Sequence, residues 1–102
     1  MTSYGGAVTQ TIPSVPDATS FELVPANPFR RFIFIANLGS NDFGLSLTGA
    51  TITGTTATAT NPVLPFGSGS VYSNYFDFVP TGAITVYQAS GGALEELLVI
   101  EG

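Results

Sequence analysis

Residues 31–37, Arg-Phe-Ile-Phe-Ile-Ala-Asn, decide the fold class of this chain. Their aromatic and β-branched side chains favour a β-strand. A turn sequence follows at residues 38–42, and residues 43–47, Phe-Gly-Leu-Ser-Leu, then alternate large apolar with small side chains. Because the side chains of a strand alternate between its two faces, the three large residues share one face and Gly44 and Ser46 lie on the other. The two strands and their turn predict part of an antiparallel sheet.

Short apolar runs separated by turn residues continue on both sides of this pair of strands. The 102 residues include 12 glycines and seven prolines, and no stretch has convincing helical periodicity. Further strands are expected at residues 19–24, 63–66, 70–78, 84–89 and 96–100. We therefore predict an all-β fold, a small antiparallel β-sandwich of about seven or eight short strands formed by residues 17–102.

Residues 1–16 are expected to form an extended N-terminal arm. Gly5 and Gly6 make its start pliable, and Pro13 and Pro16 disfavour both a helix and a paired strand. Such an arm needs a surface to lie on, which is either its own domain or a neighbouring chain. We expect it to make intermolecular contacts.

Residues 48–61 consist almost entirely of threonine, alanine and glycine, and Ile52 is their only large apolar residue. This composition fits either a long loop or a thin, weakly anchored hairpin.

Two stretches, residues 32–35 and 97–100, are apolar on both faces. In a two-layer antiparallel sandwich one face of each strand normally meets water. Either the arm or a loop covers the outward face of these strands, or a second subunit does.

Charged residues make up only 9% of the chain, against about 25% in an average soluble domain. The only cations are Arg30 and Arg31, and the formal net charge is −5. Neutralising nucleic-acid phosphates requires several spread cations, so no nucleic-acid partner is expected. A surface with so few charges favours association with other protein chains.

The residue types that most enzymes use are missing. The sequence has no histidine, cysteine or lysine, so the usual general bases, thiol nucleophiles and soft metal ligands are absent. The spacing of the seven carboxylates singles out no glycosidase pair. We predict no catalytic residue, no cofactor and no metal site, and so a protein that is not an enzyme.

The longest fully apolar run, residues 32–36, is far shorter than the ~20 residues that span a bilayer. The first six residues lack the basic and apolar regions of a signal peptide. We expect a soluble protein that is made in the cytoplasm and has no membrane partner.

Three weaker signals each have an ordinary structural interpretation. Asn41-Asp42 and Glu95-Glu96 could offer oxygen ligands to calcium, but they are typical of a hairpin turn and a solvated strand end. The aromatics of residues 72–78 (Tyr72, Tyr75, Phe76 and Phe78) could stack on a sugar, although core packing is favoured. Of Arg30-Arg31, beside Phe29, one arginine is expected to bind a carboxylate of the adjacent turn within the chain, and the other could dock an acidic partner.

Residues 27–37, Asn-Pro-Phe-Arg-Arg-Phe-Ile-Phe-Ile-Ala-Asn, resemble a pattern found in small virion-associated proteins of tailed bacteriophages. There an Asn-Pro-x-Arg turn precedes an apolar strand that ends in asparagine. Four further segments of this chain resemble later parts of the same pattern, in the same order: residues 39–45, 67–70, 79–84 and 98–102. The resemblance covers about residues 20–102, leaves out the arm, and has a shorter segment where this chain has its threonine-rich stretch.

Members of this family are decoration, head-fibre or other structural proteins of the particle. The resemblance implies a capsid decoration protein on the outer capsid surface of the virion. It would bind the major capsid protein and clamp neighbouring capsomers, with a homotrimer at local three-fold positions favoured. The alternatives are a receptor- or glycan-binding module of a fibre or tail, and a tail or neck structural protein. The interface residues expected on this hypothesis are Tyr4, Val8, Ile12, Val15, Phe29, Arg30, Arg31, Ile52, Leu97 and Leu98.

Overall fold

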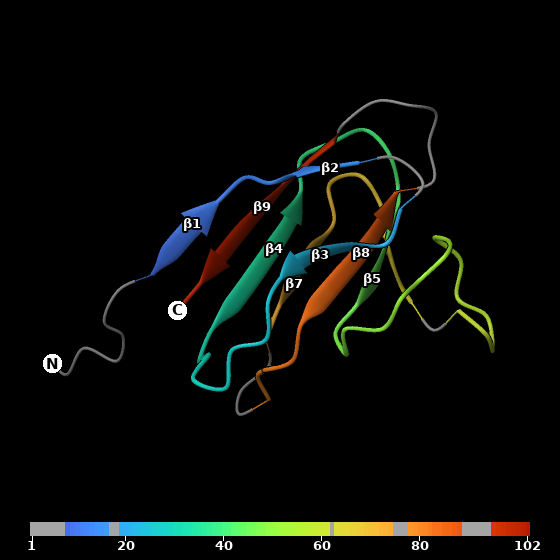
Figure 1. The fold of residues 1–102 in the computed structure, drawn as a ribbon. Helices are drawn as coiled ribbons and strands as arrows, with labels where there is room; N and C mark the ends of the chain where they lie inside the picture. Colours follow the sequence, from blue (N-terminus) through green and yellow to red (C-terminus); the bar gives the residue numbers. More distant parts are fainter. Residues whose placement is uncertain (1–7, 17–18, 62, 75–77, 89–94) are drawn as a thin grey trace, which may run out of the picture.

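The computed structural model describes residues 8–16, 19–61, 63–74, 78–88 and 95–102, which form two packed antiparallel sheets (Figure 1). The larger sheet has the order β1-β9-β4-β7, with β2 also paired to β9; its strands are β1 (Thr9–Thr11), β2 (Ser14–Val15), β4 (Ile33–Asn37), β7 (Val71–Ser73) and β9 (Glu95–Glu101). The smaller sheet has the order β3-β8-β5-β6; its strands are β3 (Phe21–Val24), β5 (Phe43–Ser46), β6 (Leu64–Phe66) and β8 (Ile84–Gln88).

The predicted all-β class and antiparallel sandwich are confirmed. Each expected strand between residues 19 and 102 is present, in most cases with tighter bounds, because the ladders end before the flanking turns begin. The strand expected at residues 70–78 is described as β7 only, and residues 75–77 lie outside the described part of the chain. The count of described strands exceeds the expected seven or eight because the N-terminal segment adds β1 and β2.

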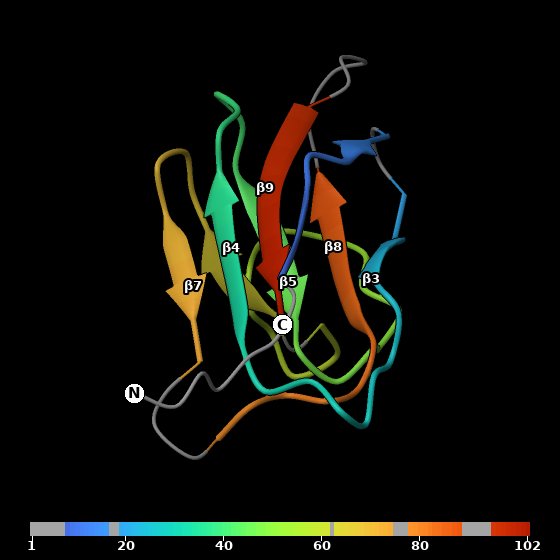
Figure 2. The same ribbon diagram turned by 90° about the vertical axis from the view of Figure 1, so that its left-hand side faces the viewer.

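The core lies between the two sheets. Figure 2 shows β7, β4 and β9 side by side in one layer, with β8 in the layer behind. Odd-numbered residues of β4 and β9 point inward, so that Ile33, Ile35 and Leu97 are fully buried. They meet the inward residues of the smaller sheet; the buried cluster is Val15, Val24, Ile33, Ile35, Phe43, Leu45, Phe66, Ile84, Val86, Leu97 and Val99.

The described part of the expected arm, residues 8–16, is built into the sandwich. β1 pairs with the end of β9, where Thr11 lies opposite Val99. β2 pairs with the start of the same strand. Val15 is fully buried, and its carbonyl oxygen accepts a hydrogen bond of 3.1 Å from Nε2 of Gln88. The two prolines are accommodated because they fall outside β1 and β2.

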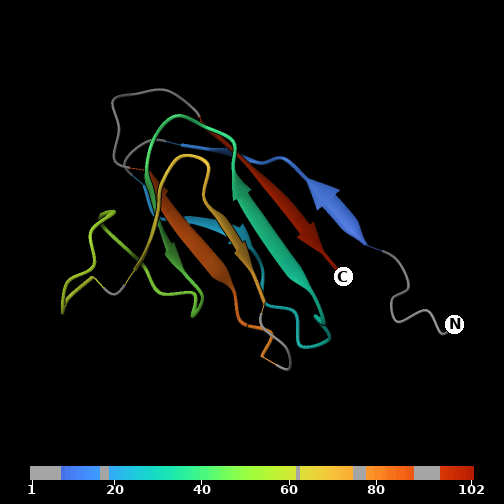
Figure 3. The same cartoon turned by 180° about the vertical axis from the view of Figure 1, so that it is seen from behind.

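The threonine-rich segment forms the long connection between β5 and β6 and contains no strand. Of the two expected alternatives, it is therefore a long loop and not a hairpin. Figures 1 and 3 show it on the side of β5 that faces away from β4 and β9. Ile52 is 1% exposed, and the Ala50 carbonyl oxygen accepts a 2.6 Å hydrogen bond from Oγ1 of Thr85 in β8. A Cβ atom on Gly44 of β5 would lie 2.5 Å from the Gly54 carbonyl oxygen. The loop therefore packs directly on the outer face of the smaller sheet.

Asn61 holds this loop closed. Its side-chain oxygen accepts a hydrogen bond of 2.9 Å from the Thr53 N–H, and its Nδ2 donates one of 3.1 Å to the Thr56 carbonyl. The side chain is 8% exposed. These bonds replace the ladder that a hairpin would have supplied.

Candidate interaction surface

The outward side of the larger sheet carries large apolar side chains with no layer of the described chain over them. In β4 and β9 the even-numbered residues point outward, and the register places Phe34 beside Ile100 and Ala36 beside Leu98. The β7 register places Val71 beside Ala36 on the same side, and that valine is 58% exposed. We call this surface the outer apolar face; its residues are Val8, Ile12, Phe32, Phe34, Val71, Leu98 and Ile100.

The centre of the outer apolar face is half-buried, whereas its margins are open. Phe34, Leu98 and Ile100 are each half-buried. Val8 and Ile12, which flank β1, are 60% and 50% exposed. Contiguous exposed apolar surface of this kind is typical of a contact with another protein.

Among the described strands of this sheet, the charged residue on the outward side is Glu96, which is exposed near the start of β9. Arg31 is exposed just before Phe32, near the other end of the sheet. Glu101 points inward and binds Arg30. An apolar centre with polar ends is the usual layout of a protein–protein interface.

The structure describes nine of the ten sequence-predicted interface residues, and these fall into three groups. Val8, Ile12 and Leu98 lie on the outer apolar face, and Phe29 and Arg31 are exposed at one end of the sandwich. Tyr4 lies outside the described residues. Four of the predicted residues have side chains buried in the chain's own fold, which removes them from the candidate surface: Val15, Arg30, Ile52 and Leu97.

Arg30 has an internal role. Its side chain is fully buried, and Nε lies 2.6 Å from Oε2 of Glu101. Its guanidinium also donates to the carbonyl oxygens of Pro80 (2.5 Å), Gly82 (3.0 Å) and Pro25 (2.7 Å). One arginine was expected to bind a carboxylate within the chain, and Arg30 does so, although its partner comes from β9 rather than from an adjacent turn. The guanidinium joins the larger sheet to the loops at the ends of β3 and β8.

Phe29 and Arg31 border a surface hollow of about 520 Å³ together with Pro28 and Arg30. Phe29 is 86% exposed. It lies in a turn in which Oδ1 of Asn27 accepts a 3.0 Å hydrogen bond from the Phe29 N–H. An exposed aromatic ring beside a guanidinium can dock an apolar or acidic segment of a partner.

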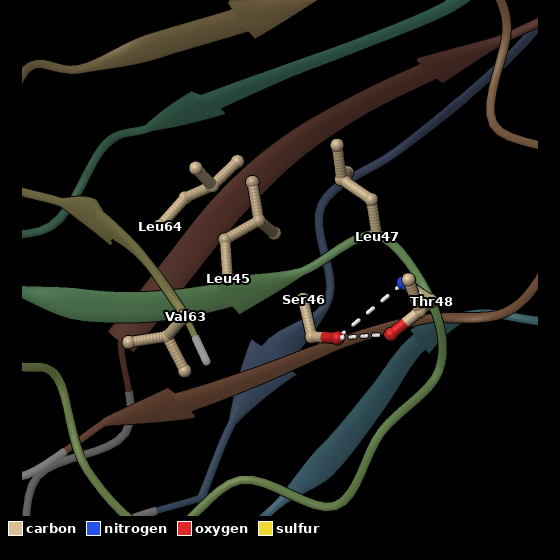
Figure 4. A pocket seen from close by; sticks show the side chains of 6 residues that line it. All are labelled: Leu45, Ser46, Leu47, Thr48, Val63 and Leu64. Atoms are coloured by element: carbon tan, nitrogen blue, oxygen red, sulfur yellow. Dashed lines mark hydrogen bonds between the residues drawn. The ribbon is translucent and has the colours of Figure 1, made fainter. Parts of the chain in front are cut away.

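A second hollow, of about 450 Å³, lies where β5 and β6 meet the following loop (Figure 4). Its lining residues are Leu45, Ser46, Leu47, Thr48, Val63 and Leu64. Ser46 and Thr48 bond to each other through their hydroxyl groups at 3.1 Å, so the polar atoms of the hollow are turned to one another. This lining holds no acid, base or nucleophile pair of the kind that catalysis requires.

The weaker sequence signals also have positions in the structure. Tyr72 packs against the core, as the core interpretation predicted, whereas Phe78 is 63% exposed; Tyr75 and Phe76 lie outside the described residues. Nδ2 of Asn41 donates a 2.8 Å hydrogen bond to Oε1 of Gln88. In the described ranges no cluster of three or more potential metal-binding acidic, histidine or cysteine side chains occurs. Nor do those ranges contain a helix long and apolar enough to cross a membrane.

Sequence reasoning missed most of the outer apolar face. Phe34 and Ile100 were inside the two non-alternating stretches, and the alternation from their buried neighbours would have identified them. Val71 has no such signal, because its strand is only three residues long. Comparison with protein-family models, with curated proteins and with solved structures found no match for this chain.

Proposed function

We propose that this protein is a structural protein of a tailed-phage virion, a capsid decoration protein that binds the outer capsid surface and clamps neighbouring capsomers. The observation that carries the proposal is the outer apolar face, whose large side chains call for cover by other protein chains. The resemblance of residues 20–102 to small virion proteins supports the choice of a phage particle as the setting.

The mechanism is burial of apolar surface. A stable protein contact hides about 800 Å² on each partner. Repetition of the contact over a shell multiplies modest individual affinities through avidity. A protein that binds the assembled shell and not the loose capsomers stabilises the shell by its binding free energy.

Two surfaces divide this work. The outer apolar face packs against chains that lie beside the sandwich, and the end of the sandwich that carries Phe29 and Arg31 contacts the shell. Because the sequence has only two cations, and Arg30 is occupied internally, the contacts are mainly apolar.

The test adds the protein back to shells assembled without it. The wild type is expected to bind to saturation and to raise the temperature at which the shells rupture. Leu98→Glu puts a charge in the middle of the outer apolar face and should reduce binding at least tenfold, because an unpaired carboxylate is costly to desolvate. Leu64→Glu is the matched control, since Leu64 is 46% exposed on the smaller sheet and should leave binding unchanged.

Circular dichroism must show both variants folded. Shells that neither bind the wild type nor gain stability from it would contradict the decoration function. In that case a receptor- or glycan-binding module would be the next candidate, and the exposed Phe29 and Phe78 would be its first residues to test.

A further inference from the structure

The larger sheet ends in two strands that each have an open edge. β1 pairs with β9 on one side and β7 pairs with β4 on one side, and among the described strands neither has a partner on its other side. Both strands are three residues long, and neither contains a charged residue or a proline. A three-residue strand offers only a short ladder, but an edge without charge or proline can still pair with another chain.

The edges of the smaller sheet are protected. β6 carries Pro65 at its centre, and proline removes a ladder donor. β3 carries the charged Glu22, and its register with β8 shifts between Glu22 and Val24. Charge and irregularity are the usual means of preventing edge pairing. Strand addition is therefore open to the larger sheet and closed to the smaller one.

The open edge of β1 is centred on Gln10. Phe32 and Gly102 exchange two main-chain hydrogen bonds of 3.0 Å each on the β4 side of β9. Main-chain groups alternate in direction along an antiparallel strand, so those of Glu101 point the other way and meet Thr9. The N–H and carbonyl of Gln10, one residue further along, therefore point away from β9.

The open edge of β7 is formed by Val71 and Ser73. The Asn37 N–H donates a 2.9 Å hydrogen bond to the Ser70 carbonyl, and the Asn74 N–H donates one of 3.3 Å to the Ile33 carbonyl, so that these groups of Ser70 and Asn74 point at the β4 side. Tyr72, midway between them, has the same direction. Val71 and Ser73 therefore direct their main-chain groups away from β4.

The two edge strands run in opposite directions, because neighbours are antiparallel at each of the three steps from β1 to β7. In a closed ring whose axis is parallel to the strands, β1 of one copy and β7 of the next then pair antiparallel. We propose that three copies of this chain join in this way, head to tail, to form a ring. The choice of three copies rests on the proposed function.

One register brings like side chains together. Pairing Gln10 with Ser73 of the next copy places Ile12 opposite Val71, so a polar pair and an apolar pair form side by side. All four side chains are exposed in the single chain. Because Val71 lies on the outward side, the outer apolar face continues across the junction. The sandwich bulk lies outside the ring, and the outer apolar faces of the three copies turn toward the common axis.

The test uses the full chain and two double variants at these exposed positions. Gln10→Asp with Ser73→Asp places like charges opposite each other at each junction, and should weaken the junction about tenfold. Gln10→Lys with Ser73→Asp places opposite charges there and should keep the trimer. Thr51→Asp with Thr56→Asp, in the loop over the smaller sheet, matches the added charge of the first variant and should also keep the trimer.

Sedimentation equilibrium up to about 100 µM, within the range of weak association, measures the assembly state. A wild type that stays monomeric overturns the proposal, as does dissociation of the loop control. Dissociation of the Lys/Asp variant also overturns it, because that result would indicate β1 pairing with β1 of a second copy. A monomer that still binds shells would refute the ring and leave the proposed function standing, and a trimer that ignores shells would do the reverse.

Discussion

The two outer faces of the sandwich differ in their side chains and in whether a loop of the chain covers them. On the smaller sheet the outward residues of β5 are small, Gly44 and Ser46, and lie beside Tyr87 and Thr85 of β8, and a loop of the same chain packs on this face. On the larger sheet the central outward residues are mostly large and apolar, such as Phe34, Leu98 and Ile100, and no described strand or loop packs over them. The chain therefore covers the outer face that carries fewer large apolar side chains, and its described residues leave the more apolar face uncovered.

The difference follows from what a threonine-rich loop can bury. Its backbone approaches β5 closely because Gly44 has no side chain, and Ile52 fills the space beneath. Over Phe34 and Leu98 the same loop would be held away from the sheet and leave gaps, which forfeit dispersion contacts. Large apolar side chains need equally large partners, and the described part of the chain places none over this face.

Arg30→Leu should have the largest effect, because it removes the buried side chain that links the two sheets. The buried guanidinium bonds to Glu101 in the larger sheet and to carbonyl groups flanking the smaller one. Removing it leaves these groups unpaired, so the free energy of unfolding should fall by about 3–5 kcal/mol. This is a large share of the roughly 5–15 kcal/mol that stabilises a domain.

Urea unfolding followed by circular dichroism gives the measurement. Arg31→Leu is the control; Arg31 is exposed, and its replacement should change the free energy of unfolding by about 0.5 kcal/mol or less. Equal losses in the two variants would show that Arg30 does not hold the sheets together.

The sequence predicted the sandwich well because apolar periodicity and turn residues are local signals. The phase of Phe-Gly-Leu-Ser-Leu at residues 43–47 placed its inward residues correctly. Local signals do not reveal which distant segment covers a face. For that reason Ile52 and Val15 were expected at an interface, although a loop contact buries the first and the core buries the second. Arg30 and Leu97 were misplaced for the same reason, since their burial depends on residues far along the chain.

The two faces can be compared directly with one pair of isoleucines. Ile52→Ala removes the side chain that fills the covered face, and should lower the free energy of unfolding by about 3 kcal/mol. Ile100→Ala removes a half-buried side chain from the outer apolar face and should cost about 1 kcal/mol in the dilute single chain. Thermal or urea unfolding below 1 µM, roughly the range in which weak contacts dissociate, measures both. A cost for Ile100→Ala as large as that for Ile52→Ala would mean that the outer apolar face is already covered.

Glu96→Gln should have the smallest effect and sharpens the comparison most. Glu96 is exposed at one end of the outer apolar face, so association brings its charge close to a surface that excludes water. In a ring of copies, the equivalent carboxylates also approach one another. Replacing Glu96 with glutamine should strengthen self-association about two- to fivefold, and leave the free energy of unfolding within about 0.5 kcal/mol.

Salt separates this charge effect from simple apolar burial. Raising the ionic strength from 0.1 M to 1 M shortens the screening length from about 10 Å to about 3 Å. Wild-type association should therefore tighten slightly with salt, whereas that of Glu96→Gln should stay nearly constant. Glu22→Gln is the matched control, because Glu22 is also exposed but lies on the outward side of the smaller sheet, away from the outer apolar face. If sedimentation showed the same gain for both variants, net charge alone would govern association, and the outer apolar face would have no special part in it.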